Sequence, residues 1–184
     1  MIDNLITEVM KAEGWDKYTD HPADRGGPTK WGITLKAWSE WRGHDVSAIE
    51  VKNITEAQAR DFYEKLYVIG PRFNQLPERI VPLVVDCGVN HGVRRASKWV
   101  QQAIGAKADG FIGPKSIQAA LDCNPIATHL LISASRIKLY GRLVSSDPTL
   151  KAAKRAGFRT QAEFSAGWNN RAAKFLVTLA QSLK

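Results

Sequence analysis

The segment AEGWDKYTDHPADRGGPTKWGIT, residues 12–34, gathers the residue types that acid–base chemistry needs. Glu13 lies where an amphipathic helix is expected to end, and the carbonyl end of a helix carries partial negative charge. That charge disfavours an ionised carboxylate, so Glu13 is suited to hold the proton that a general acid donates near neutral pH. Asp24 follows eleven residues later in a polar, glycine-containing loop, where a carboxylate is expected to stay ionised.

Two carboxyl groups held in opposite protonation states are the usual equipment for cleaving a glycosidic bond. Thr29 adds a hydroxyl that can orient a water molecule, and the aromatic rings of Tyr18 and Trp31 can stack on sugar faces. The two adjacent glycines of the segment let the backbone turn and let a sugar approach closely. A simpler explanation is that the glutamate is a solvated helix end and the aspartate a turn residue. Residue types alone leave both explanations open.

The elements around this segment are expected to be helical. The apolar residues Ile2, Leu5, Ile6, Val9 and Met10 recur at helical spacing, which predicts a helix over residues 2–13 that Gly14 ends. Residues 14–33 are expected to form an ordered loop or a short β-hairpin. Further helices are predicted from residue 55, at 79–92 in the buried centre, at 94–105, from residue 125, and from about 160 to 182. The fold class is therefore all-α, with an active-site loop or small hairpin after the first helix.

Composition narrows the classes of partner and cofactor. The net charge of +8 suits a polyanion such as nucleic acid, an anionic membrane or an acidic cell-wall polymer. Cys87 and Cys123 form no CxxC pair, which favours a reducing compartment. No HExxH motif or His/Cys cluster is present, so we expect no metal and no other cofactor. The first residues do not read as a signal peptide and no apolar run is long enough to anchor the chain in a membrane, so a cytoplasmic location is expected until release.

The segment also resembles the N-terminal signature of glycoside hydrolase family 108. The matching residues are Glu13, Gly14, Pro22, Asp24, Gly26, Gly27, Thr29, Gly32, Ile33 and Thr34. Further on, DCGVNHG at 86–92 resembles the D-x-x-V-N-x-G motif of the family, and ADGFIGPKSIQAAL and GWNNR at 167–171 resemble a type 3 peptidoglycan-binding segment. The resemblance thus runs through nearly the whole chain in order.

The resemblance implies a lysozyme-like N-acetylmuramidase, of the kind found among phage endolysins, that cuts the β-1,4 bond after N-acetylmuramic acid in peptidoglycan. It implies Glu13 as the acid and Asp24 and Thr29 as the residues that hold or activate water. Because the loop after Glu13 is about two residues longer than the family pattern, Asp20 remains an alternative to Asp24 as the second carboxylate. The residues expected to contact the glycan are Tyr18, Asp20, Trp31, Asn90 and Trp168.

Residues 1–80 are expected to be the muramidase catalytic segment and residues 81–184 the peptidoglycan-binding segment, packed together as one domain. The expected partners are peptidoglycan and a holin or another release factor, with the chain a monomer that binds no nucleic acid. Two other classes stay open: a wall-binding module without catalysis, and a basic helical protein that binds nucleic acid. Neither needs paired carboxylates in a glycine-rich loop. The sequence leaves open whether the chain is a phage endolysin or a bacterial muramidase, and whether it inverts or retains configuration.

Overall fold

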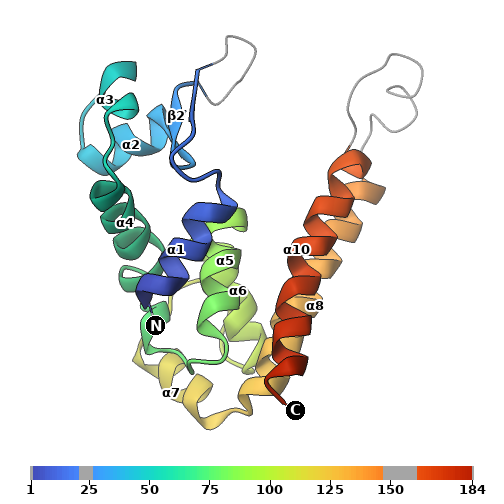
Figure 1. Cartoon of the computed structure of the whole chain (residues 1–184). Coiled ribbons are helices and arrows are strands. Elements are labelled where there is room, and N and C mark those ends of the chain that lie inside the picture. Colours follow the sequence, from blue (N-terminus) through green and yellow to red (C-terminus); the bar gives the residue numbers. More distant parts are fainter. Residues whose placement is uncertain (1, 21–26, 147–160, 184) are drawn as a thin grey trace. The chain divides into compact units, whose positions relative to one another are not determined.

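The computed structural model describes residues 2–20, 27–146 and 161–183 (Figure 1). The chain forms two compact units, Met1–Asn74 and Gln75–Lys184. Helices make up most of the described residues, and the strands form one small sheet. The all-α class with a small hairpin-like sheet after the first helix is therefore confirmed. Within these described ranges, every helix is too short or too polar to cross a bilayer.

The first unit begins with helix α1, Ile2–Ala12, which buries Ile6, Val9 and Met10 as the apolar spacing predicts. The segment after it contains strand β1, Tyr18–Thr19, and strands β2, Thr29–Lys30, and β3, Ile33–Thr34, follow. The three strands pair antiparallel in the order β1–β2–β3, with Tyr18 opposite Lys30. Each strand has only two residues, which is too short for alternation to show in the sequence.

Three helices complete the first unit: α2, Leu35–Arg42, α3, Ala48–Lys52, and α4, Glu56–Glu64. Thr55 and Gln58 form the predicted capping box at the start of α4. The helix continues into a π-helical turn, Lys65–Ile69, and a 3₁₀ turn follows at Phe73–Gln75. Helix α1 packs on α4, and Arg60 of α4 reaches Asp3 and the Thr7 hydroxyl, each at 2.9 Å. Figure 1 shows α2, α3 and the sheet gathered at one end of this unit.

The described residues of the second unit contain helices α5, Val81–His91, α6, Val93–Ala103, α7, Pro114–Asp122, α8, Pro125–Ser145, and α10, Gln161–Gln181. Helix α5 is its buried centre, and seven of its eleven residues are buried. Asn124 caps α8 through its side-chain oxygen, with Pro125 in the first turn. The two longest helices, α8 and α10, lie side by side and run antiparallel (Figure 1).

Candidate active site

Glu13 lies one residue beyond the end of α1, at the carbonyl end of the helix. Its backbone N–H donates to the Val9 carbonyl at 3.0 Å, and two residues later the Trp15 N–H donates to the Met10 carbonyl at 2.9 Å. Gly14 and Trp15 then take left-handed backbone conformations, with φ of 105° and 52°. The chain therefore leaves the helix sharply, and the half-buried Glu13 stays packed against its own unit.

Gly32 lies directly against Glu13. A Cβ atom at Gly32 would stand 2.6 Å from the Glu13 Cβ and 2.8 Å from the Tyr63 hydroxyl oxygen. Gly32 also has a φ of 76°, a conformation that side chains rarely adopt. The position therefore requires glycine for two reasons, and the β2–β3 turn that contains it can approach Glu13 only because no side chain intervenes.

Aromatic residues support the same turn. The Tyr63 hydroxyl donates to the Trp31 carbonyl at 2.8 Å, and the Trp31 indole N–H donates to the Ile54 carbonyl at 2.9 Å. The Trp15 ring meets the Trp31 ring edge to face at 5.4 Å. Burial, and then the negative charge of Glu13, raise the pKa of Tyr67, so this phenol keeps its proton at neutral pH. Glu13 thus lies against a glycine turn that the Tyr63 hydroxyl holds through the Trp31 carbonyl.

The remaining candidate residues of the first unit lie on and beside the small sheet. Thr29 on β2 donates its hydroxyl to the Gly27 carbonyl at 3.0 Å. The Tyr18 hydroxyl on β1 donates to an Asp20 carboxylate oxygen at 3.2 Å, and the Asp20 residue is exposed. Trp31 is only 5 % exposed, so its ring belongs to the core of this unit. Asp24 lies outside the described residues.

The two candidate residues of the second unit, Asn90 and Trp168, each contact neighbouring groups of that unit. Asn90, near the end of α5, donates its side-chain amide to the Asp86 carbonyl at 2.7 Å. The half-exposed Trp168 on α10 stacks on the ring of Tyr140 on α8 at 5.4 Å, and Phe164 stacks on it at 6.2 Å. Their roles in glycan binding stay predictions.

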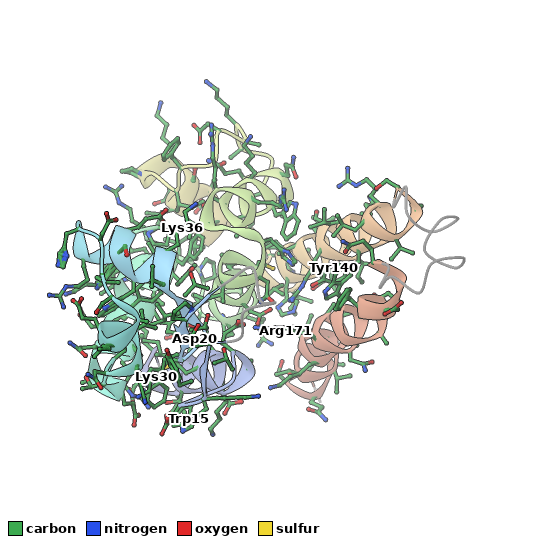
Figure 2. All side chains as sticks on the ribbon, turned by 90° about the horizontal axis from the view of Figure 1, so that it is seen from above. Trp15, Asp20, Lys30, Lys36, Tyr140 and Arg171 are labelled. Carbon is green, nitrogen blue, oxygen red and sulfur yellow. The ribbon has the colours of Figure 1, made fainter. Side chains whose placement is uncertain are left out.

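A buried ion cluster joins three helices of the second unit. Asp86 on α5 pairs with Arg136 on α8 at 2.6 Å, and its other oxygen accepts from two nitrogens of Arg171 on α10 at 2.8 and 2.7 Å. Arg136 is fully buried and donates to the Tyr140 hydroxyl at 2.6 Å. Figure 2 labels Tyr140 and Arg171 where α8 and α10 face each other. The DCGVNHG and GWNNR segments therefore meet through an ion pair.

The buried surroundings of this ion cluster shift the pKa values of two nearby side chains, His91 and Cys87. Burial, followed by the nearby Arg136 charge, lowers the pKa of His91 to about 4, so this imidazole is neutral at physiological pH. Burial raises the pKa of the Cys87 thiol to about 12, which makes it a core residue and not a nucleophile. Across the part of the chain that the structure describes, no three His, Cys, Asp or Glu side chains gather to bind a metal ion.

Comparison with known proteins defines the class. Residues 6–92 match the family model described as Glycosyl hydrolase 108, and residues 95–173 match the one described as Predicted Peptidoglycan domain. Among solved structures, one titled "Structure of Brucella abortus SagA" is 29% identical, with a TM-score of 0.75 over 98% of this chain and 94% of that chain. No curated protein matches the sequence.

The two matched parts make this protein a glycoside hydrolase that acts on peptidoglycan, on an all-α, lysozyme-like fold. Residues 6–92 thus form a part similar to glycosyl hydrolase family 108, and a part similar to a peptidoglycan domain follows it.

Proposed function

We propose that this protein is an N-acetylmuramidase that cleaves the β-1,4 bond between N-acetylmuramic acid and N-acetylglucosamine, with Glu13 as general acid. The observation that carries the proposal is the placement of Glu13. In a glycoside hydrolase domain, Glu13 lies at the carbonyl end of α1 with its Cβ against Gly32, and its charge contributes to the raised pKa of Tyr67. A half-buried carboxyl side chain at the end of a helix is held in one place, so it can meet the oxygen of the leaving sugar as a general acid must.

The other residues have complementary roles in the proposal. Glu13 protonates the oxygen of the leaving sugar, while Asp24 and Thr29 hold and activate the attacking water; Asp20 is the alternative to Asp24. Thr29 donates its proton to the Gly27 carbonyl, so its oxygen can still accept a hydrogen bond from water. The rest of the glycan contacts are assigned to Tyr18, Asn90 and Trp168. Trp31, which the sequence also suggested, has a buried ring that supports the β2–β3 turn instead.

Residues 1–80 form the catalytic segment in this proposal, and residues 81–184 bind peptidoglycan. The net charge of +8 attracts the chain to the carboxylates of the wall polymer. The chain acts as a monomer, and a holin or another release factor brings enzyme and wall together.

The first experiment identifies the bond that is cut. Purified peptidoglycan is digested with the full chain, the products are reduced with borohydride, and the reduced sugars are identified. A muramidase leaves N-acetylmuramic acid at the new reducing ends, so only reduced muramic acid is expected to increase. Reduced glucosamine would mean that the other glycosidic bond is cut, and no new reducing ends would leave a wall-binding module.

The second experiment tests Glu13. Glu13→Gln removes the transferable proton and keeps the size of the side chain. We expect about a 10²–10⁴-fold loss of hydrolysis with an unchanged circular dichroism spectrum, since this is the usual contribution of a general acid. The exposed Glu40→Gln on α2 is the matched control and should keep full activity. A folded Glu13→Gln protein with more than about a tenth of normal activity would exclude Glu13 as the acid.

A further inference from the structure

Phe111 is a large apolar side chain that the second unit presents to solvent. It lies between α6 and α7 in the ADGFIG segment and is 70% exposed, while the neighbouring Ile112 is only 6% exposed. Exposing a phenylalanine gives up the stabilisation that its burial would provide. The loop therefore buries the Ile112 side chain and exposes the Phe111 side chain to solvent.

The loop is held from within by Gln101, which is 1% exposed. Its side-chain amide donates to an Asp109 carboxylate oxygen at 2.8 Å and to the Phe111 carbonyl at 2.9 Å, and its oxygen accepts from the Gly110 N–H at 2.8 Å. The Phe111 N–H donates to the same Asp109 oxygen at 3.0 Å. These bonds use only the backbone of Phe111, so its ring is not needed to shape the loop.

Arg94 lies beside the exposed ring. Its guanidinium carbon is 5.9 Å from the centre of the Phe111 ring. Gly110 has a φ of 90°, and a Cβ atom there would stand 2.6 Å from the Arg94 Cγ and 3.3 Å from its Nε. The arginine stem thus packs flush against the loop backbone, which fixes the guanidinium next to the ring.

The charge around this pair is positive. Residues 93–115 contain five basic residues and one acid, Asp109. One Asp109 oxygen is already engaged by Gln101 and the Phe111 N–H. None of the five basic side chains forms an ion pair with a carboxylate among the described residues. Cations therefore outnumber carboxylates in this segment, and Arg94 has no ion pair with a carboxylate among the described residues.

We propose that Phe111 and Arg94 form a peptidoglycan-binding site on the second unit, in which the Phe111 ring stacks on the C–H face of a sugar and the Arg94 guanidinium binds a carboxylate of the wall polymer. Peptidoglycan supplies sugar faces and carboxylates together along one strand. A planar guanidinium matches a carboxylate through two parallel hydrogen bonds, which a lysine cannot make. The match of residues 95–173 to a peptidoglycan domain supports this choice of partner.

The test measures binding of the full chain to purified peptidoglycan by sedimentation on ice. Phe111→Ser and Arg94→Gln are each expected to weaken binding about tenfold, the size typical of a central interface residue. The matched controls are Leu121→Ser, a 56% exposed apolar residue of α7, and Lys138→Gln, an exposed cation of α8 outside residues 93–115. Both controls should stay within about twofold of the unchanged chain.

Three further measurements identify the chemistry. Arg94→Lys should restore only part of the loss. Amidation of the peptidoglycan carboxyls should abolish the difference between Arg94→Gln and the unchanged chain, yet leave the Phe111→Ser defect. Hydrolysis of a short soluble glycan should not change in any variant. These results hold whether or not the chain proves to be a muramidase, because they depend on binding alone.

Several outcomes would overturn the proposal. One is an equal loss for Phe111→Ser and Leu121→Ser, which would show general stickiness of exposed apolar residues. Another is unchanged binding of the Phe111→Ser chain with its melting temperature intact. Competition by duplex DNA that removes the Phe111 and Arg94 dependence together would assign the surface to nucleic acid instead.

Discussion

Gly32 shows how one residue without a side chain sets the surroundings of the proposed acid. Its backbone passes so close to Glu13 and to the Tyr63 hydroxyl that any Cβ atom would collide with both. Gly43, at the end of α2, has nearly the same φ of 75° but nothing within 4 Å of a Cβ atom. An alanine at Gly43 would therefore add backbone strain alone, whereas an alanine at Gly32 would add both backbone strain and a steric collision.

We expect Gly32→Ala to destabilise the protein by about 2–4 kcal/mol, from the left-handed backbone and the overpacking together. Gly43→Ala should cost only about 1–2 kcal/mol, because strain is its sole defect. Urea unfolding of the two variants gives the comparison. Activity should fall for Gly32→Ala and persist for Gly43→Ala under conditions where both are folded. Equal destabilisation would mean that the turn can move away from Glu13.

Single substitutions can also show whether Asp24 or Asp20 is the second catalytic carboxylate. Asp24→Asn is expected to lower hydrolysis more than Asp20→Asn, yet less than Glu13→Gln, since the aspartate assists the water while the glutamate transfers the proton. Asp20 already accepts a hydrogen bond from Tyr18, so Tyr18→Phe is a useful companion variant. Rates are compared on purified peptidoglycan at one pH. The reverse order of the two aspartates would move the role to Asp20.

At the level of elements, α5, α8 and α10 are held together by the charges of Asp86, Arg136 and Arg171. Asp86→Asn would leave two arginines without their counter-ion, and the loss of one partner of a buried ion pair typically costs about 3–5 kcal/mol. Arg171→Met should cost less, because its side chain is 24% exposed and Arg136 still neutralises Asp86. Lys138→Gln, exposed on α8, is the control. Urea unfolding measures all three, and a mild effect of Asp86→Asn would show that water solvates the two arginines once the carboxylate is lost.

The elements themselves were largely predictable, because their signals are local. The apolar spacing of α1, the capping box before Glu56 and the Asn124–Pro125 start of α8 all lie within one or two turns of the feature that they define. The position of Glu13 at a helix end was predictable for the same reason. Two features were not predictable from the sequence. One is the support of the site by tyrosines of α4 and its π-helical turn, and the other is the set of partners of Asp86. Arg136 lies 50 residues from Asp86 and belongs to no motif, so only the folded chain shows that a charge is buried there.

At the level of the whole molecule, the family boundary and the structural boundary do not coincide. The hydrolase match extends to residue 92, but α5, at Val81–His91, belongs to the second compact unit. Its buried residues include Leu83, Val84 and Cys87, each no more than 1% exposed. A fragment cut at the family boundary would carry this apolar helix without the helices that cover it.

We therefore expect residues 1–92 to aggregate and residues 1–74 to remain in solution when each is expressed alone, because exposed apolar helix surface drives association. Residues 75–184 should unfold in one cooperative transition. Recovery of the soluble fractions and their thermal melts provide the comparison. A soluble, monomeric 1–92 fragment with full helical content would show that α5 can be covered by the first unit.

The ion pair between Asp86 and Arg171 cannot form during translation until Arg171 has been synthesised. The two residues are 85 positions apart, so at 5–20 residues per second the ribosome needs about 4–17 s to make the second after the first. All residues of the first unit are synthesised before this interval begins. During the interval, α5 lacks both the Arg171 partner of Asp86 and the later helices that cover its apolar surface. Chaperones that bind nascent chains are therefore expected to engage the α5 stretch, and slower translation between α5 and α10 should lower the yield of native protein.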